Sequence, residues 1–535
     1  GVLGLFHNPY ALTCAALASL GGLMFGYDQG VIANVLVMPD FMDRFPMGAF
    51  EQGALTAVLE FGALFGALTA GMFADGISRQ RAICIGCAMF SVGSLLQCVA
   101  SSIFTLFIGR ALGGIGIGSL SMLSPLYMSE ISPPEVRGSL LSIEQFSIVL
   151  GVVAGFWLGF WTRDFPGSAC WRVPLGVQLI PGLVLGFTSL LLPPSPRLLA
   201  LHGRDQEALE SLAKLRMRVG MEDDPLLQLE YTEMKLEVLL IRRNEPTGPS
   251  VHSKSTWRAK VVSWSYLFTP AYRAQTLIGV LVMFFQQWSG INALLYYGPS
   301  IMASMGLEGD TILLIGSGFI NIVQFLFVVP AIMLIDRWGT RPLLMVGAVV
   351  MGASHGLIAI LVWKGQSDWH AHQTEAWIAV GLVYLFTAAY GMSFGPVAWV
   401  LPSEIFPLSV RSRGVALSTA SNWLNNFIIG LITPTMIAAS AVGTYFVFAA
   451  ACVAAFFWAK YLVPETKGRS LEEMDDVFRS SVGHEHALLK QQVRWEIRGH
   501  KGCAICANRS LLPQLEEEIG LRGKVDTLIN WDPSE

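Results

Sequence analysis

The stretch SEISPPEVR, residues 129–137, returns later in the chain as SEIFPLSVR, residues 403–411. The two copies share the pattern S-E-I-x-P-x-x-V-R, which chance explains poorly. Each copy follows a long apolar run, the fourth run of the chain in the first case and the tenth in the second. A repeat in this register predicts two related halves of six helices each. Transporters with such repeats bind their substrate near the bilayer midplane, between the halves.

The composition supports helices that cross a membrane. Only 14% of the 535 residues are charged, compared with about 25% in soluble domains. Apolar runs of about 20 residues match the roughly 30 Å hydrocarbon core of a bilayer. With a net charge of −4 and no basic region, nucleic acid is excluded as a partner. We expect an all-α protein with spans at residues 11–36, 52–73, 82–100, 103–128, 139–161, 171–192, 274–299, 311–335, 342–363, 376–401, 413–437 and 441–462.

The distribution of Lys and Arg predicts the orientation. Arg79, Arg137, Arg337 and Arg411 lie in connections on the same side as the Lys- and Arg-rich segment 197–273. Such residues are enriched on the cytoplasmic side of membrane proteins. We therefore expect a plasma-membrane protein with both termini in the cytoplasm. Its predicted parts are an N-terminal bundle, a small helical linker, a C-terminal bundle and a tail, at residues 1–192, 193–273, 274–462 and 463–535.

Nothing in the sequence predicts an enzyme, a metal site or a cofactor. The eight cysteines are scattered, and Cys503 and Cys506 form a single C-x-x-C without a second pair at zinc spacing. There is no phosphate-binding loop and no candidate nucleophile with a base. We expect no obligate protein partner, and the tail is interpreted as solvated.

Four charged residues lie inside apolar runs, where a charge costs roughly 2.5–3.5 kcal/mol. Asp28 in the first run and Arg110 in the fourth have opposite charges and are expected to pair. A carboxylate whose proton affinity depends on such a pair suits proton coupling, although a static ion pair between helices is the alternative. Glu60 is either a second proton site or a partner in a helix-to-helix hydrogen bond, and Glu144 is expected to influence Arg110.

Neutral hydrogen-bonding side chains cluster in the seventh run. Gln286, Gln287 and Asn292 lie within seven residues, around Gly290. Amides both donate and accept hydrogen bonds without a fixed charge, as a sugar hydroxyl requires. The cluster therefore predicts a site for a neutral sugar.

Charged residues also recur at equivalent places on the predicted cytoplasmic face. Asp75 and Arg79 follow the second run, and Asp336 and Arg341 follow the eighth. We expect acid and base pairs to join helix ends there and to hold one access state closed. The repeated motif contributes the remaining members of this set, Glu130, Arg137, Glu404 and Arg411.

Over about residues 15–475 the chain resembles the sugar porter branch of the major facilitator superfamily. The motifs are GRALGGIGIG at 109–118, SEISPPEVRG at 129–138, PPSPR at 193–197, QQWSGIN at 286–292, DRWGTR at 336–341 and PETKGRSLEEMD at 464–475. Ser78, Gln80 and Pro194 depart from the usual pattern of the family, and all three belong to the cytoplasmic gate.

The resemblance implies twelve transmembrane helices with the major facilitator fold, and proton symport through Asp28. It implies an extracellular gate at Tyr296 and Tyr297, for which anchoring at the membrane interface is the alternative. It also implies that the residues lining the sugar cavity include Gln145, Asn321, Trp399, Asn422 and Trp423.

Together these observations predict proton-coupled uptake of a neutral monosaccharide, a hexose or pentose, by alternating access. A facilitative carrier is the first alternative, and a transporter of a polyol, a disaccharide or quinate is the second. A sensor that binds sugar without transporting it is a third, although the tail of about 70 residues has no repeated docking motif.

Overall fold

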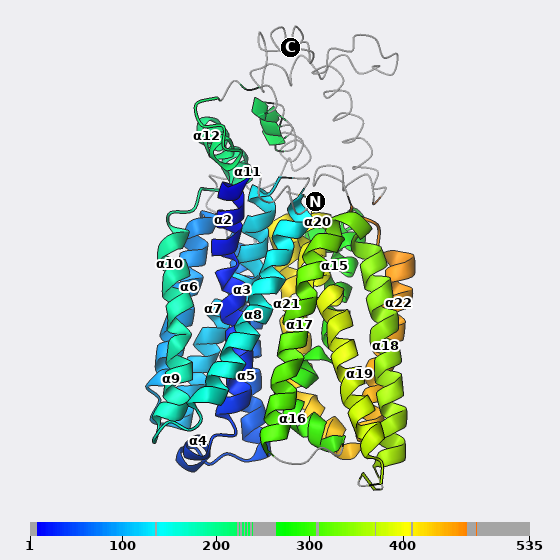
Figure 1. The fold of residues 1–535 in the computed structure, drawn as a ribbon. Helices are drawn as coiled ribbons and strands as arrows, with labels where there is room; N and C mark the ends of the chain where they lie inside the picture. Colours follow the sequence, from blue (N-terminus) through cyan, green and yellow to red (C-terminus); the bar gives the residue numbers. More distant parts are fainter. Residues whose placement is uncertain are drawn as a thin grey trace.

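The computed structural model describes residues 8–133, 136–221, 264–305, 310–366, 371–407 and 410–467, with short pieces at 224–238, 368–369 and 478. All regular secondary structure in these ranges is helical (Figure 1). The N-terminal half contains α2 (Pro9–Ala18), α3 (Leu20–Val35), α4 (Pro39–Arg44), α5 (Ala49–Phe73), α6 (Arg79–Cys98), α7 (Ile103–Ile131), α8 (Arg137–Thr162), α9 (Ala169–Val177) and α10 (Leu179–Ser189). The connecting segment contains α11 (Pro196–Leu201), α12 (Asp205–Leu215) and a short 3-10 turn, η2 (Tyr266–Phe268). The C-terminal half contains α15 (Arg273–Trp288), α16 (Ile291–Ser304), α17 (Asp310–Trp338), α18 (Thr340–Gly365), α19 (Gln373–Met392), α20 (Phe394–Ile405), α21 (Arg411–Ala439) and α22 (Ala441–Leu462).

Eleven segments of the described chain are long and apolar enough to cross a membrane. The remaining predicted span corresponds to α21, which has 29 residues and packs against α5 and α15 inside the bundle. This helix buries polar residues that lower its mean hydropathy, among them Ser418, Thr419, Asn422 and Asn426. The fold agrees with the predicted twelve spans, and α21 is the C-terminal helix that packs against α5 of the N-terminal half.

The helices of each half pack mainly on one another. In the N-terminal half α3 lies on α8, and α5 and α6 lie on α7, whereas α18 lies on α19 and α22 in the C-terminal half. The halves meet most extensively where α5 packs on α21 and α8 packs on α17. Smaller contacts join α20 to α7 and α8, α16 to α3, and α21 to α7. The α3 and α8 backbones are in direct contact, because a Cβ atom on Gly26 would lie only 1.7 Å from the carbonyl oxygen of Ile148.

Several spans are interrupted near their middle. Gly290, with φ +95°, separates α15 from α16, and an L-residue with a side chain rarely adopts this conformation. Ser393 separates α19 from α20, and its φ and ψ of −128° and −91° are not helical. Both interruptions expose backbone groups inside the C-terminal half, which is tolerated in a membrane only where protein or a cavity surrounds them.

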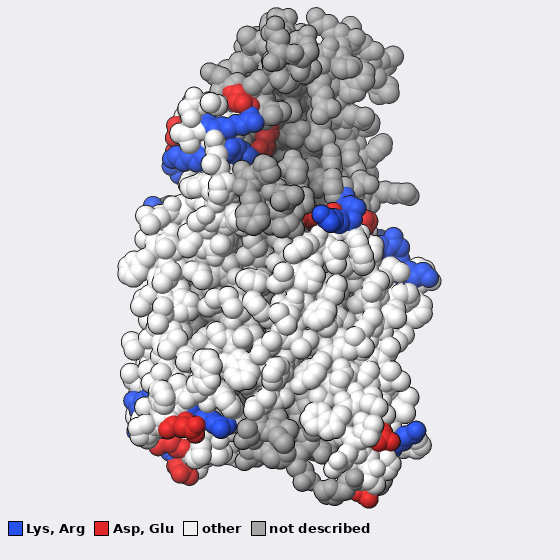
Figure 2. Space-filling model, in the orientation of Figure 1, with Lys and Arg blue, Asp and Glu red and all other residues white. Residues whose placement is uncertain are grey.

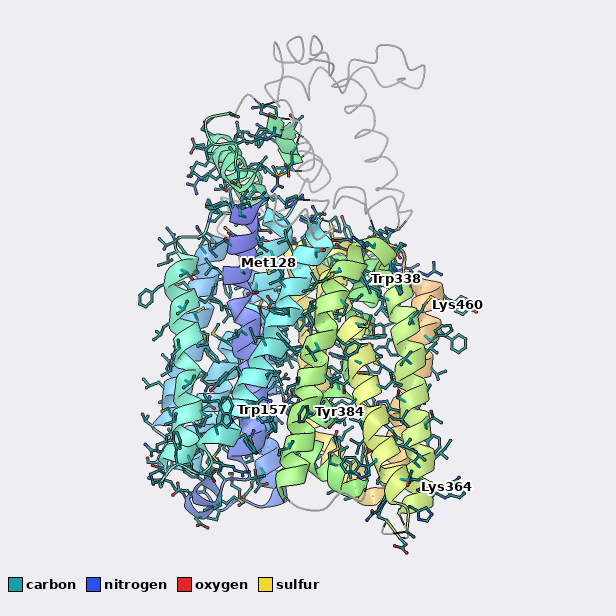
Figure 3. The ribbon with its side chains drawn as sticks, in the orientation of Figure 1. Met128, Trp157, Trp338, Lys364, Tyr384 and Lys460 are labelled. Atoms are coloured by element: carbon teal, nitrogen blue, oxygen red, sulfur yellow. The ribbon has the colours of Figure 1, made fainter. Side chains whose placement is uncertain are left out.

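On the face of the molecule that Figure 2 shows, charged residues gather at the two ends and leave an uncharged belt between them. Trp338 and Lys460 lie toward the end that carries α11 and α12, and Lys364 lies at the opposite end (Figure 3). The connecting segment is attached to the first of these ends. Tyr127 donates a hydrogen bond to the carbonyl oxygen of Pro193 at 2.8 Å, and Arg216 donates one to that of Ile131 at 3.1 Å. The predicted C-x-x-C and most of the tail lie outside the described residues.

We predict that Gly26→Ala destabilises the protein, because the added methyl group would overlap the backbone of α8. Overpacking of this kind costs about 1–3 kcal/mol. Thermal unfolding of the detergent-solubilised protein, followed by size-exclusion chromatography, measures the change. Gly381→Ala is the matched control, because no atom lies within 4 Å of the Cβ position at this exposed site on α19. Equal stability of the two variants would contradict the close packing of α3 on α8.

Candidate functional site

A small polar cavity lies between the two halves. Its space of about 20 Å³ has room for roughly one water molecule, so the surrounding side chains must move before a sugar can enter. Residues of both halves line it: Phe25 and Gln29 on α3, Gln145, Ile148, Val149 and Val152 on α8, Gln286 and Gln287 on α15, Ile291, Asn292 and Leu295 on α16, Gln324 on α17, Tyr390 on α19, Trp399 on α20 and Asn422 on α21.

Six of the eight residues predicted to bind substrate belong to this lining: Gln145, Gln286, Gln287, Asn292, Trp399 and Asn422. Trp423 packs behind the lining, with its ring centroid 4.7 Å from that of Phe25 and its indole nitrogen donating to Ser121 Oγ at 3.0 Å. Asn321 is buried on α17, outside the set of lining residues. The structure thus brings most of the predicted set together from five helices.

Four polar or aromatic lining residues were not predicted. Gln29 and Gln324 are amides inside apolar runs, and the argument applied to Gln286 would have found them. Phe25 and Tyr390 have no such signal, because aromatic residues are frequent throughout the chain.

The amides of the cavity bond to one another and to the interrupted helices. Asn422 Nδ2 donates to Gln286 Oε1 at 2.5 Å, and Asn292 Nδ2 donates to Gln287 Oε1. Gln286 Nε2 in turn donates to the carbonyl oxygens of Phe394 and Gly395, at 3.2 and 3.3 Å, at the start of α20. The side-chain amide of Gln286 therefore connects the first turn of α20 to the cavity.

Two buried acceptors in the cavity receive no hydrogen bond from the described residues. These are Asn422 Oδ1 and Gln324 Oε1. An unsatisfied buried polar atom costs about 1–3 kcal/mol, which a ligand hydroxyl that donates to it would recover. The cavity thus contains two acceptors without a donor and several amides that could bond to a ligand instead of to one another. This arrangement suits a neutral ligand with several hydroxyl groups.

Asp28 and Arg110 form a buried ion pair beside this cavity. Arg110 Nη2 lies 3.2 Å from Asp28 Oδ2, and both side chains are at most 2% exposed. Arg110 also donates to the carbonyl oxygen of Leu55 at 2.7 Å and to Gln97 Oε1 at 3.5 Å. The arginine therefore joins α3, α5 and α6, while the residue after Asp28, Gln29, lines the cavity.

Glu144 and Glu60 are both 1% exposed. Glu144 faces α3, where a Cβ atom on Gly22 would lie 2.8 Å from Glu144 Oε1, and neither of its carboxyl oxygens bonds to a described residue. Gly22 lies about 9 Å along α3 from Asp28. Glu60 lies beside Tyr296 on α16. The two carboxyls thus occupy different helix junctions, to either side of the Asp28 pair.

The two predicted gate tyrosines connect α16 to neighbouring helices. Gln29 Nε2 donates to the Tyr296 hydroxyl at 2.8 Å, and the Tyr297 hydroxyl donates to the carbonyl oxygen of Gly430 on α21 at 2.6 Å. Tyr297 has the non-helical φ and ψ of −118° and 23° at a kink in α16. These contacts hold α16 against the N-terminal half and α21 at the end of the cavity away from α12.

At the end that carries α12, two aspartates accept hydrogen bonds from the opposite half, and the two contacts are equivalent. Ser412 Oγ, in the first turn of α21, donates to Asp75 Oδ2 at 2.5 Å. Ser139, in the first turn of α8, donates to Asp336 Oδ2 through its hydroxyl and through its backbone nitrogen, the latter at 3.3 Å. Each half thus contributes one aspartate that binds the first turn of a helix in the other half.

The charged groups around these contacts differ between the halves. Arg79 Nη2 pairs with Glu130 at 2.7 Å and with Asp75 at 3.2 Å. Glu404 lies beside Arg137, and Arg411 Nε donates to the carbonyl oxygen of Phe406 at 3.0 Å.

Asp336 and Arg341 were expected to form an acid–base pair, but each of them bonds to a different group. Asp336 binds Ser139, and Arg341 donates to the carbonyl oxygen of Lys460. Gly339, at φ +92°, turns the chain between them, whereas Asp75 and Arg79 are four residues apart without such a turn.

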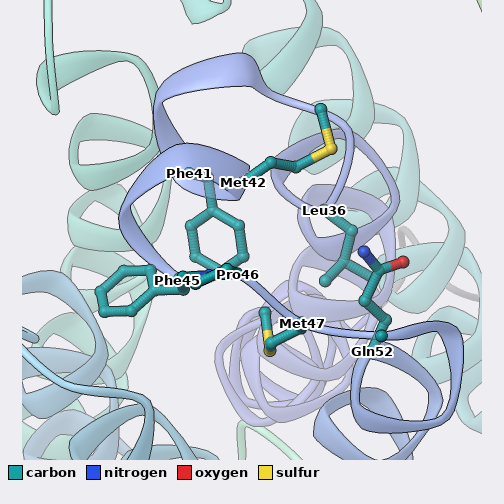
Figure 4. Close-up of a pocket in the computed structure, with 8 residues that line it drawn as sticks. Leu36, Phe41, Met42, Phe45, Pro46, Met47 and Gln52 are labelled. Carbon is teal, nitrogen blue, oxygen red and sulfur yellow. The ribbon is translucent and has the colours of Figure 1, made fainter.

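A larger pocket of about 360 Å³ lies at the opposite end, in the connection from α3 to α5 (Figure 4). Its lining is mainly apolar, with Phe41, Phe45 and Met47, and Gln52 is the side chain there with both a donor and an acceptor. A sugar needs several hydrogen-bonding partners, so the smaller amide cavity is the better candidate.

The fold matches that of the proton:xylose symporter XylE bound to 6-bromo-6-deoxy-D-glucose, with a TM-score of 0.75 and 26% identity, over 88% of this chain and 99% of that chain. The TM-score falls to 0.66 and 0.63 for the partially occluded inward-open and the inward-open conformations of XylE from Escherichia coli. The conformation described here therefore resembles the ligand-bound form more than the inward-open forms.

Two curated relatives align over most of both chains. A protein named MFS glucose transporter mfs1, from Aspergillus flavus, is 31% identical over 89% of this chain and 90% of its own length. The galactose-proton symporter of Escherichia coli is 33% identical over 86% of this chain and 92% of its own length. The family model described as sugar (and other) transporter matches residues 14–478. This chain therefore belongs to the sugar transporter family of the major facilitator superfamily, as a multi-pass membrane transporter and not an enzyme.

Proposed function

We propose that this transporter carries a neutral monosaccharide, a hexose or a pentose, into the cell together with a proton. The observation that carries the proposal is the buried pair of Asp28 and Arg110, one residue away from Gln29 in the amide cavity. A proton that binds Asp28 weakens the pair at the edge of the sugar site. The names of two similar proteins, a galactose-proton and a proton:xylose symporter, support this assignment.

The chemistry of the cavity favours a neutral substrate. Its hydrogen-bonding side chains are amides, a tyrosine and the tryptophan Trp399, all of them neutral, and the adjacent cation, Arg110, is already bound to Asp28. An acid such as quinate would need a cation of its own, because a buried charge without a partner is costly. The indole of Trp399 offers an apolar face to the C–H side of a sugar ring.

We propose that residues 1–192 and 274–462 are the two bundles that rock against each other. Residues 193–273 would form the linker between them, and residues 463–535 the tail. The arginine-rich end with α12 would face the cytoplasm, with both termini there, in the plasma membrane. A charge that crosses a membrane potential of 100 mV supplies about 2.3 kcal/mol, or about 50-fold accumulation of sugar.

Asp28→Asn is predicted to abolish accumulation while leaving sugar exchange intact. In cells without hexose carriers of their own, the wild type should accumulate labelled glucose, and a protonophore should collapse the gradient. The variant should equilibrate the sugar without accumulating it, because its neutral amide binds no proton. Asp43→Asn, at an exposed site on α4, is the matched control and should accumulate glucose normally.

Uptake that resists the protonophore, or accumulation that survives Asp28→Asn, would show a facilitator in which the ion pair is structural. Unlabelled xylose, galactose, a polyol, a disaccharide and quinate, added as competitors, distinguish the substrate classes. A surface-expressed protein that transports none of them would instead fit a sugar sensor.

Asn422→Leu should weaken sugar binding selectively. The substitution removes a hydrogen-bond donor to Gln286 and the buried acceptor Oδ1 while keeping the side-chain size. We expect KM to rise about 10-fold or more, since a hydrogen bond in a buried site is worth about 1–3 kcal/mol. The variant should also stop discriminating against the deoxyglucose that lacks the hydroxyl which Asn422 binds.

Gln366→Leu, at the exposed end of α18, is the control for that experiment and should leave KM unchanged. If Asn422→Leu kept the wild-type KM and the full order of deoxyglucose affinities, Asn422 would be a packing residue and not part of the sugar site.

The aspartate contacts between the halves should hold the cytoplasmic side closed. Ser139→Ala and Ser412→Ala each remove a hydrogen bond to a carboxylate, which is worth about 1.5–3 kcal/mol. Each variant should raise the apparent KM for external sugar about 3–10-fold by depleting the outward-facing population. It should lower the KM for sugar presented to the cytoplasmic side of inside-out vesicles.

Ser189→Ala serves as the control, because Ser189 bonds within its own helix, to Gly186. A parallel rise of KM on both sides of the membrane would point to damage of the binding site rather than to a shift between access states.

A further inference from the structure

Four helices meet at the outer end of the cavity around the carboxyl group of Glu60. A Cβ atom placed on Gly430 of α21 would lie 3.5 Å from Glu60 Oε2 and 3.9 Å from Cε2 of Tyr296. Glu60 and the Tyr296 hydroxyl are hydrogen-bond partners, and the same hydroxyl accepts from Gln29. The carboxyl on α5 thus contacts the gate helix α16 where α16 meets α3 and α21.

Among the residues that the structure describes, no cation pairs with this carboxyl alone. The charged groups that act on it are Arg110 on α7 and Asp28 on α3, which pair with each other at 3.2 Å. On α16 its titratable neighbours are Tyr296 and Tyr297. The arginines of α21, Arg411 and Arg413, lie about 25 Å or more away along that helix.

The closed gate leaves little to stabilise a negative charge at Glu60. Its side chain is 1% exposed, and Oε2 has no hydrogen-bond partner among the described residues. A buried carboxylate without a counterion of its own costs several kcal/mol, whereas a neutral carboxyl costs much less. When α16 swings away, water can reach the carboxyl and stabilise its charge. Gate closure therefore favours the neutral form.

We propose that Glu60 is a second proton-binding site of this transporter, and that its neutral form is required for α16 to close over the sugar cavity. The proposal rests on the proposed transport function but not on Asp28 as the coupling residue. A proton taken from the outside would bind Glu60 in the open state and be trapped when the gate closes.

Linkage sets the size of the effect. If one proton distinguishes the open from the closed gate, the closed-to-open ratio changes by at most about tenfold per pH unit. Acidic medium should favour the closed gate, and alkaline medium should favour the open one. The removal of the titrating group should abolish this dependence and leave the gate predominantly closed.

The test measures the distance across the gate in the full-length protein in liposomes. Spin labels are attached to Gln52→Cys on α5 and Ser304→Cys on α16, in a background without reactive native cysteines, and the distance distribution is recorded between pH 5 and pH 8. The wild type should show a closed-to-open ratio at least about tenfold higher at pH 5. Glu60→Gln should show a change of less than about twofold, with the closed form dominant.

Two variants control for the change in shape and position. Glu60→Asp keeps a carboxyl and should keep the pH dependence, and Glu51→Gln, at the exposed outer end of the same helix, should behave as the wild type. Tyr296→Phe removes the hydroxyl that donates to the Glu60 carboxylate, so the charged form loses a partner in the closed gate. This variant should keep the pH dependence and open more than the wild type at pH 8, a result that tests the proposal even if Glu60→Gln fails to fold.

A wild-type pH response in Glu60→Gln, or a pH response smaller than that of the wild type in Tyr296→Phe, would overturn the proposal. So would a gate in the unsubstituted protein that does not respond to pH. Failure of the symport assignment is separate, because accumulation in Asp28→Asn reports it.

Discussion

The charge of Arg110 must be compensated entirely from within the protein, and much of the N-terminal half is organised around this requirement. Water is absent from the bilayer core, so the guanidinium takes its partners from three helices: Asp28 on α3, the backbone of Leu55 on α5 and Gln97 on α6. This compensation places a carboxylate next to Gln29, which lines the cavity. Protonation of Asp28 would leave Arg110 with backbone and amide partners only. The protonated and deprotonated forms of the pair would then differ in free energy, and such a difference can shift the balance between two conformations of a carrier.

The cavity follows a related logic with neutral groups. Gln286, Gln287, Asn292 and Asn422 satisfy much of their hydrogen-bonding capacity among themselves, so they remain stable in a low-dielectric site without a ligand. At the proposed site a sugar would exchange these bonds for its own, and the free energy gained would be the difference between two hydrogen-bonded sets. Because Gln286 also binds the first carbonyl groups of α20, this exchange reaches the backbone of the C-terminal half.

The sequence predicted the features that repeat or that violate hydropathy. The twelve spans, the amides around Gly290 and the opposite charges of Asp28 and Arg110 follow from one-dimensional patterns. The span of α21 was predicted despite its polar residues because residues 413–437 still form an apolar run. Three-dimensional choices were harder to predict. The partner of Asp336 is Ser139, nearly 200 positions earlier, and the turn at Gly339 that redirects Arg341 has no hydropathy signal. The residues around Glu60 come from three other helices, so the sequence could not predict them either. The roles of the site residues remain predictions.

The reciprocal glycine contacts between α3 and α8 limit where substrate preference can change among related transporters. Gly26 and Gly30 lie against backbone carbonyls of α8, and Gly151 and Gly155 lie against those of α3, so neither helix can slide without a collision. Asp28 and Gln145 are thereby held on one rigid unit. The C-terminal half instead contacts the cavity through helices interrupted at Gly290 and Ser393. New sugar preferences can therefore arise by amide replacements in the C-terminal half while the spacing between ion pair and cavity in the N-terminal half is preserved.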